Sequence, residues 1–82
     1  MAQPKVVIFV RPDCPACREA MAFFAEHHVP YDDRDVEFDP AALREMLQHD
    51  ARETPTIVID GEVIEGFDRH RLETILEDYG IP

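Results

Sequence analysis

The sequence predicts an α/β fold in which a four-stranded mixed sheet carries three helices, in the order β-α-β-α-β-β-α. Three observations predict this fold. Residues 6–10 are β-branched or aromatic, three segments repeat apolar side chains at helical spacing, and Asp60-Gly61 separates two short apolar segments, as in a β-hairpin. With 82 residues the chain fits one small domain, spanning 1–82, whose core is large enough to fold alone.

The first predicted strand, residues 5–10, is a near-continuous apolar run, which is typical of a strand buried on both faces. We therefore expect it at the centre of the sheet. A helix should begin at Pro15, because proline is favoured in the first turn, where its missing N–H has no intrahelical partner. The helix should end before Val29-Pro30, since a residue that precedes proline is disfavoured in the α conformation. Its predicted apolar face comprises Cys17, Ala20, Met21, Phe24 and His28.

The second predicted strand, residues 31–38, is acidic, which suits an edge strand because charge discourages pairing with another chain. Asp39-Pro40 predicts the start of a second helix, with aspartate as N-cap and proline at the first helical position. This helix should end near residues 48–50, and its predicted apolar stripe comprises Leu43, Met46 and Leu47. The two strands and the helix between them form a βαβ unit, so we expect the strands to be parallel and the crossover right-handed.

The last third of the chain predicts a hairpin and a third helix. Residues 56–59 and 62–65 should pair as antiparallel strands, because glycine in Asp60-Gly61 accepts the positive φ of a tight turn. Asp68 is the candidate N-cap of the helix, and Gly80 suits its end. The predicted apolar positions of this helix are Leu72, Ile75, Leu76 and Tyr79. Burying all the stripes requires helices on both faces of the sheet.

The charge of the chain restricts its partners. The formal net charge is -10, from 18 acidic and 8 basic side chains. Such a surface repels phosphate backbones and anionic lipids, so we expect no nucleic-acid partner and no membrane partner. The apolar run near the N-terminus is far shorter than a signal-peptide core or the about 20 residues of a membrane span. We therefore expect a cytoplasmic protein, and a monomer.

The chemistry lies in Cys14-Pro15-Ala16-Cys17, which follows the buried strand and opens the first helix. As the N-cap, Cys14 would face free backbone N–H groups and the positive end of the helix dipole, both of which favour a thiolate. Cys17 lies one turn into the helix, on its apolar face, and should be more buried and less acidic. This asymmetry predicts that Cys14 attacks a disulfide as the nucleophile and that Cys17 is the resolving thiol that releases the product.

Two other uses of the cysteine pair are alternatives to catalysis. A structural disulfide would close too short a loop to constrain the unfolded chain much. A zinc site needs four ligands, and the histidines show no spacing that would complete the two cysteines within one chain. We therefore expect no metal site and interpret the histidines as surface or partly packed side chains: His27, His28, His49 and His70.

A second position of interest is Pro55, which begins a strand after the polar residues Glu53-Thr54. A cis peptide there would turn the chain sharply and leave the backbone of Thr54 open to an extended partner. A trans proline at the start of a strand is more common, so the residues alone leave the isomer open.

Together, the dithiol after a buried strand, Thr54-Pro55 before another strand and Gly66-Phe67-Asp68 at the last helix resemble the glutaredoxin family of the thioredoxin fold. The resemblance covers essentially the whole chain. It implies that Pro55 is cis and packs against the dithiol, that the Thr54 backbone pairs with the substrate, and that Arg11 contacts the anionic end of glutathione. The other substrate- or glutathione-binding positions that it implies are Pro15, Ala16, Gly66, Phe67 and Asp68.

The resemblance also implies an activity. It predicts a thiol-disulfide oxidoreductase that reduces protein or glutathione mixed disulfides and serves electron transport and cell redox homeostasis. No tightly bound cofactor is expected, and glutathione is the expected co-substrate and electron source. The implied partners are disulfide-bearing proteins together with glutathione or thioredoxin reductase.

Three departures from the family pattern bear on the electron source. Ala16 stands where an aromatic residue is usual, and threonine directly precedes proline in Thr54-Pro55. Glu65 replaces a glycine and would bring a like charge near a docking glutathione carboxylate. Gly66-Phe67 is similar to the redoxins that are reduced by thioredoxin reductase and donate electrons to ribonucleotide reductase, so such a redoxin is one alternative. A dimer that holds a metal or an iron–sulfur cluster through Cys14, and an interaction module with an unused dithiol, are two more.

Overall fold

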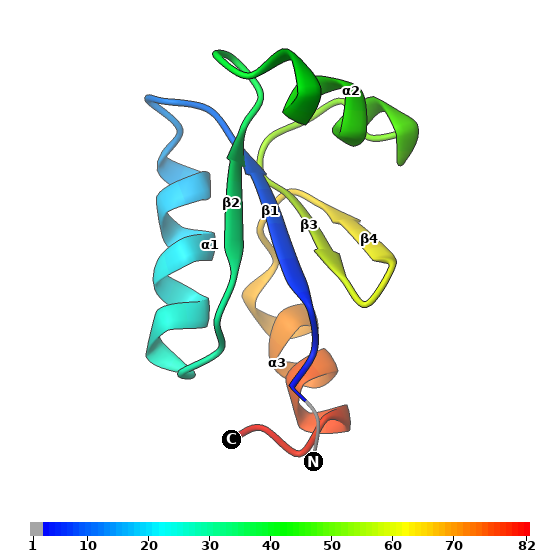
Figure 1. The fold of residues 1–82 in the computed structure, drawn as a ribbon. Coiled ribbons are helices and arrows are strands. Elements are labelled where there is room, and N and C mark those ends of the chain that lie inside the picture. Colours follow the sequence, from blue (N-terminus) through cyan, green and yellow to red (C-terminus); the bar gives the residue numbers. More distant parts are fainter. Residues whose placement is uncertain (1–2) are drawn as a thin grey trace.

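The computed structural model describes residues 3–82 and contains the predicted elements in the predicted order (Figure 1). The strands form one sheet in the order β2-β1-β3-β4. β1 pairs in parallel with β2, whereas β3 pairs antiparallel with both β1 and β4. The predicted α/β fold with a mixed sheet is therefore confirmed. The elements are β1 (Val6–Val10), α1 (Pro15–Glu26), β2 (Asp32–Asp35), α2 (Pro40–Gln48), β3 (Thr56–Ile59), β4 (Glu62–Glu65) and α3 (Arg69–Asp78).

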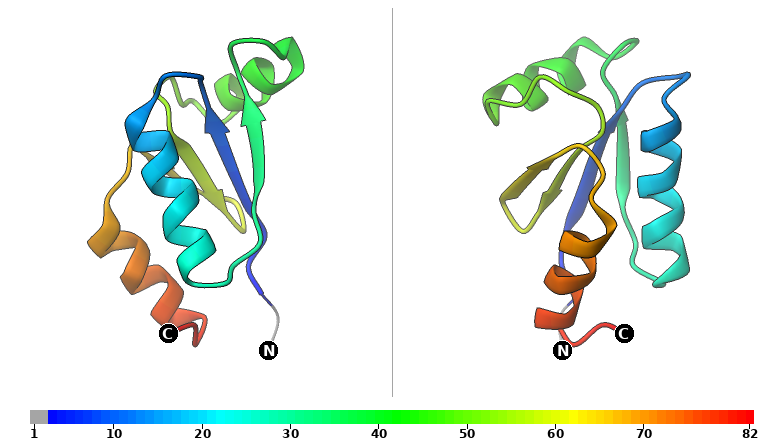
Figure 2. Two further views of the ribbon diagram at one scale, coloured as in Figure 1. Left: turned by 90° about the vertical axis from the view of Figure 1, so that its left-hand side faces the viewer. Right: turned by 180° about the vertical axis from the view of Figure 1, so that it is seen from behind.

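The helices cover both faces of the sheet, as predicted. α1 and α3 lie on one face, and α2 lies beyond the other (Figure 2). Buried side chains form one hydrophobic core on each face of the sheet. β1 contributes to both cores, because successive side chains of a strand point to opposite faces. Ile8 is buried on the side of α1 and α3, and Phe9 is buried on the side of α2. The prediction that this apolar strand lies at the centre is confirmed.

α1 begins where the sequence predicts, but its buried face differs from the prediction. Phe23 is fully buried in addition to the predicted Phe24, because Phe67 covers it from the segment before α3, with the two ring centroids 6.1 Å apart. His28 was expected on the apolar face, and this was wrong. It lies beyond the end of the helix, exposed, with a left-handed φ of 57°. The buried residues of α1 are Cys17, Ala20, Phe23 and Phe24.

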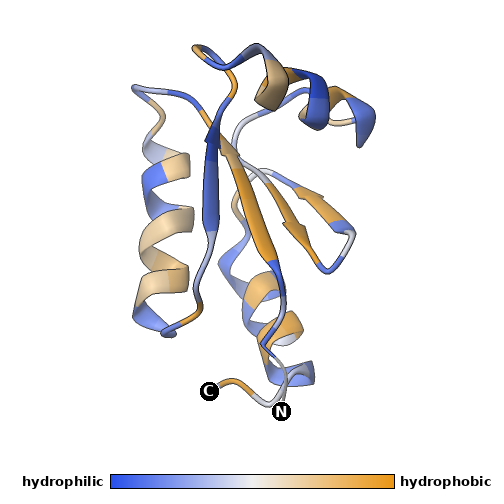
Figure 3. Ribbon diagram, viewed as in Figure 1, coloured by the Kyte–Doolittle hydropathy of each residue, from blue (hydrophilic) through white to orange (hydrophobic). Residues whose placement is uncertain are grey.

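β2 is an edge strand but is shorter than the predicted 31–38. It ends at Asp35, whose carboxylate Oδ1 accepts hydrogen bonds from the N–H groups of Glu37 and Phe38 at 2.8 and 3.1 Å. An aspartate side chain that binds the backbone two residues ahead turns the chain, and here it takes the chain out of the sheet. Phe38 is consequently 74 % exposed. The polar character of β2 contrasts with the apolar β1 and β3 in Figure 3.

α2 begins as predicted, with the carboxylate of Asp39 accepting a hydrogen bond from the Ala41 N–H at 3.0 Å. Its predicted apolar stripe was partly wrong. Met46 is fully buried together with Ala42, four residues earlier, whereas Leu43 and Leu47 are 36 % and 43 % exposed. The helix lies over one end of the sheet only (Figure 1), so a single narrow face of it is covered.

The hairpin and α3 follow the sequence closely. Asp60 and Gly61 have φ values of 47° and 90°, the left-handed conformation that a tight two-residue hairpin turn requires. The carboxylate of Asp68 caps α3 by accepting a hydrogen bond from the Arg71 N–H at 3.1 Å. Leu72 and Leu76 are buried, and the predicted Ile75 and Tyr79 are half-buried.

Within residues 3–82, no helix has both the length and the apolar character needed to cross a membrane.

Candidate active site

The two cysteines lie at the junction between β1 and α1 and form a disulfide in this structure, with their Cα atoms 5.2 Å apart. Cys14 is the N-cap of α1 and is half-buried. Cys17 lies in the first turn and is only 1 % exposed. A substrate can therefore approach Cys14 more easily than Cys17.

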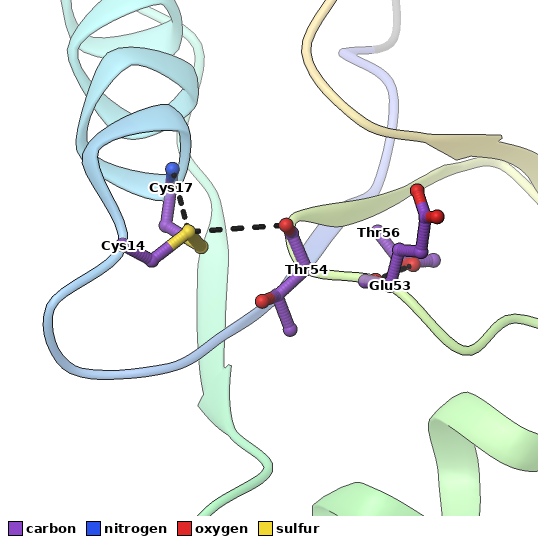
Figure 4. The surroundings of a disulfide bond; sticks show 5 residues. All are labelled: Cys14, Cys17, Glu53, Thr54 and Thr56. Atoms are coloured by element: carbon purple, nitrogen blue, oxygen red, sulfur yellow. Dashed lines mark hydrogen bonds between the residues drawn. A yellow bond between two sulfur atoms is a disulfide. The ribbon is translucent and has the colours of Figure 1, made fainter.

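The start of α1 favours negative charge on Cys14. The N–H group of Cys17 points at Sγ of Cys14 from a distance of 3.2 Å (Figure 4). In the reduced protein a hydrogen bond of this kind stabilises a thiolate, and the positive end of the helix dipole adds to it. Pro15, at the first helical position, removes no hydrogen bond and leaves this N-terminus intact.

The loop before β3 faces the dithiol. The carbonyl oxygen of Thr54 lies 3.8 Å from Sγ of Cys14 (Figure 4), and the Thr54-Pro55 peptide bond is cis. Pro55 itself is buried. The isomer that the residues alone left open is thus the one that the family resemblance implies.

A carboxylate from β4 binds the residues of this loop that precede Thr54. Oε2 of Glu65 accepts hydrogen bonds from the backbone N–H groups of Arg52 and Glu53 at 3.1 and 3.3 Å. From the sequence, Glu65 was expected only to oppose a docking glutathione carboxylate. The signal that was overlooked is the hairpin register, which places Glu65 opposite Thr56 and hence within reach of the residues that precede β3.

Two more contacts hold the same loop. The Thr56 hydroxyl donates a hydrogen bond to the carbonyl oxygen of Glu53 at 2.5 Å, and the Gly66 N–H donates one to the carbonyl oxygen of Pro55 at 2.7 Å. Gly66 has a φ of 83°, a conformation that L side chains rarely adopt, which explains glycine at this position. The structure thus links Cys14, Thr54, Pro55 and Gly66 through consecutive contacts.

The remaining predicted site residues have other surroundings. Arg11 is exposed in the loop before Cys14, and Ala16 is half-buried in the first turn of α1. Phe67 packs into the core against Phe23, and Asp68 uses its carboxylate to cap α3. The contacts described for Phe67 and Asp68 are therefore structural.

The histidines are separate from this arrangement. His27 is half-buried against Phe23, with the ring centroids 4.4 Å apart, and the other three are exposed. Across the described part of the chain, no group of three or more histidine, cysteine, aspartate or glutamate side chains is placed to hold a metal ion.

The chain is similar to a known protein family and to several solved structures. A protein-family model described as Glutaredoxin matches residues 6–64. Among solved structures, the thioredoxin-like protein BC3987 is 39 % identical, with a TM-score of 0.83 over 87 % of this chain and 99 % of that chain. The glutaredoxin-like NrdH-redoxin from Escherichia coli is 17 % identical, with a TM-score of 0.77 over 87 % of this chain and 93 % of that one, which shows a common fold.

A shorter match is found with the global transcriptional regulator Spx from Listeria innocua. It is 37 % identical over 43 residues, which make up 52 % of this chain. The matched segment spans only 33 % of the length of that regulator.

Proposed function

This chain belongs to the glutaredoxin family, and from that premise we propose that it reduces protein or glutathione mixed disulfides through Cys14 and Cys17, with glutathione as electron source. One observation supports the proposal above all. Sγ of Cys14 lies at the N-terminus of α1 and faces the carbonyl oxygen of Thr54, while Cys17 is buried in the turn behind it. This arrangement supports the roles that we propose: Cys14 as the nucleophile, Cys17 as the resolving thiol, and the Thr54 backbone as the partner of an extended substrate.

The proposed reaction proceeds through two thiol-disulfide exchanges. The Cys14 thiolate attacks one sulfur of the substrate disulfide, that S–S bond breaks, and the other substrate sulfur leaves as a thiolate that takes a proton from water. Cys17 then loses its proton to solvent and attacks Sγ of Cys14, which releases the second substrate thiol. Two electrons have passed to the substrate, and the protein is left with the Cys14–Cys17 disulfide of this structure.

Glutathione would return the protein to the dithiol. One glutathione thiolate attacks Sγ of Cys14, the Cys14–Cys17 bond breaks, and Cys17 leaves as a thiolate that takes a proton from water. A second glutathione thiolate attacks the glutathione sulfur of the mixed disulfide, which releases glutathione disulfide and the Cys14 thiolate, so that two electrons enter the protein. We assign the exposed Arg11 to the glutathione carboxylate, since a guanidinium suits that group. Pro15, Ala16, Gly66, Phe67 and Asp68 complete the proposed contact region, and no tightly bound cofactor is required.

Thioredoxin reductase is the second candidate for the electron source, and Glu65 is the observation that favours it. Its carboxylate lies at the loop that faces Cys14, where the negative charge would oppose a glutathione carboxylate. Ala16 also offers a substrate less contact than an aromatic residue would. In this case the protein would act as a redoxin that passes electrons to an enzyme such as ribonucleotide reductase.

A paired assay tests the function and the electron source together. The protein is given a protein disulfide such as that of insulin, and NADPH consumption is followed with glutathione plus glutathione reductase, or with thioredoxin reductase alone. We expect turnover with glutathione. Cys14→Ser should lower the turnover rate by about 100-fold or more, because the nucleophile is removed. Cys17→Ser should accumulate a mixed disulfide, visible as added mass, because the resolving thiol is missing.

Ala25→Ser, which adds a hydroxyl to the exposed face of α1, is the matched control and should behave as the wild type. Turnover with thioredoxin reductase alone would reassign the electron source. No turnover with either system, or full activity in Cys14→Ser, would show that the proposed function is wrong.

A further inference from the structure

We propose that Glu65 is a positioning residue for disulfide exchange, because it holds the loop whose backbone faces Cys14. The inference rests on the proposed function and adds to it a residue outside the dithiol. Glu65 is the last residue of β4 and is exposed, so it contributes little to the core. Its carboxylate nevertheless makes two hydrogen bonds to a separate segment of the chain.

The two N–H groups bound by Glu65 belong to consecutive residues, Arg52 and Glu53, directly before Thr54. Both hydrogen bonds end on the same oxygen, Oε2. A hydrogen bond to an ionised carboxylate is generally stronger than one between neutral groups. Arg52 and Glu53 are exposed and belong to no helix or strand, and this carboxylate links the N–H groups of both residues to the sheet.

Two hydrogen bonds between neutral groups also hold this loop. The Thr56 hydroxyl binds the Glu53 carbonyl and the Gly66 N–H binds the Pro55 carbonyl, so the residues on both sides of Thr54 are held. The carbonyl of Thr54 is thereby directed at Sγ of Cys14, 3.8 Å away. Removing the Glu65 carboxylate would release the N–H groups of Arg52 and Glu53 and leave the Thr56–Glu53 hydrogen bond as the described support before Thr54, so the Thr54 backbone could move relative to the sulfur.

Such movement should weaken the productive binding of an extended substrate more than the reactivity of the thiol. The hydrogen bond from the Cys17 N–H and the dipole of α1 act on Cys14 independently of the loop. A misplacement of about 1 Å in a reacting pair can cost about a hundredfold in rate. We therefore expect a loss in kcat/KM for a peptide disulfide, mainly through KM, with little change in the alkylation of Cys14.

The test compares Glu65→Ala with Glu65→Gln and with Glu62→Ala. Glutamine keeps an oxygen at the same reach. Glu62→Ala removes a carboxylate from the same strand, and that carboxylate pairs with Arg71 and makes no described contact with the loop before β3. Three quantities are measured: kcat/KM for a peptide disulfide, the rate of Cys14 alkylation by iodoacetamide, and amide hydrogen exchange. Glu65→Ala should lower kcat/KM about tenfold or more, Glu65→Gln should recover most of it, and Glu62→Ala should match the wild type.

Hydrogen exchange shows whether the loop is the cause. In Glu65→Ala the amides of Arg52 and Glu53 should exchange faster, while those of Ile57 and Val58 in β3 stay protected. Faster loop exchange with unchanged kcat/KM would overturn the positioning role, and so would equal losses in the alanine and glutamine variants. A wild-type protein whose Cys14 is alkylated normally but which reduces no disulfide would contradict the proposed function instead. Amide hydrogen exchange would then still show whether Glu65 holds the loop.

Discussion

Asp60 connects three parts of the chain through one carboxylate. Its Oδ1 accepts a hydrogen bond from the Lys5 N–H at 2.8 Å, and its Oδ2 accepts one from the Tyr79 hydroxyl at 2.7 Å. The Lys5 N–H, and secondly the Tyr79 hydroxyl, lower the pKa of Asp60 below its usual value of 3.8. The same hydrogen bond to Asp60, followed by burial and by the charges of Asp60 and Glu62, raises the pKa of Tyr79 above 10.0.

This pair predicts a pH dependence of stability. A lowered carboxyl pKa in the folded state means that Asp60 contributes stability above its unfolded pKa and loses it as the pH falls through the folded pKa. Asp60→Asn should therefore lower the urea midpoint at pH 7, and the difference from the wild type should shrink as the pH falls below the usual aspartate pKa of 3.8. Asparagine tolerates the left-handed φ of 47° at this turn, so the change keeps the turn while it removes the charge and one of the two acceptor oxygens.

Tyr79→Phe is the companion variant, since it removes the hydroxyl donor and keeps the ring. For Tyr79 the sign is opposite: its raised pKa means that its contribution is present at neutral pH and lost as the pH rises through the folded pKa. A difference between wild type and Asp60→Asn that stays constant from pH 2 to 7 would contradict this account.

At the scale of single residues, the sequence predicted groups whose role follows from local chemistry. Cys14, Asp39 and Asp68 are N-caps, and a short polar or ionisable side chain before a helix predicts that directly. The roles of Asp60 and Glu65 depend on partners that are distant along the chain. Asp60 was predicted as a turn residue, but its bond to Lys5 spans 55 positions and leaves no local signal.

At the scale of elements, α2 shows how narrowly a short helix contacts a sheet. Met46→Ala should cost about 2–5 kcal/mol in the free energy of unfolding, because Met46 is fully buried and the smaller side chain leaves a cavity. Leu47→Ala, at the neighbouring and partly exposed position, should cost less than about 1 kcal/mol. Urea unfolding followed by circular dichroism measures both. Equal losses in the two variants would contradict the burial of Met46 relative to Leu47.

The elements themselves were predictable because their boundaries carry strong local signals, such as Pro15, Pro40 and Asp60-Gly61. The predicted buried faces of the helices were wrong where two sets of apolar side chains had helical spacing. Residues 42 and 46 have the same four-residue spacing as 43 and 47, and only the position of the helix on the sheet decides between them. The burial of Phe23 likewise depends on its contact with Phe67, which is distant along the chain.

At the scale of the whole molecule, the net charge of -10 opposes compaction. Adding salt shortens the range of the repulsion to about 10 Å at 0.1 M. The melting temperature should therefore rise by a few degrees between about 10 mM and about 150 mM sodium chloride, since about 1 kcal/mol corresponds to about 4–8 °C in a domain of this size. A neutral sugar at matched osmolality serves as control, and a melting temperature that is unchanged or lowered by salt would contradict the prediction.

The layered architecture was the most predictable property of the whole molecule. Apolar stripes on three helices and a strand that is apolar on both faces require a sheet covered on each side. The sheet order is less directly encoded, but β1 could occupy only a central position and the acidic β2 only an edge. The meeting of the Cys14 turn and the Thr54 loop follows from this order, because β1 and β3 are neighbours.

The burial of Cys17 behind Cys14 has a consequence for oxidative damage. A half-exposed thiolate that meets peroxide becomes a sulfenic acid, and further oxidation to sulfinic acid is irreversible for most proteins. Cys17 is 1 % exposed, and its Cα lies 5.2 Å from that of Cys14. Its thiol would condense with the sulfenic acid, expel water and form the disulfide, which a reductant can reverse. The buried cysteine would thus protect its neighbour from overoxidation, whichever electron donor serves the protein.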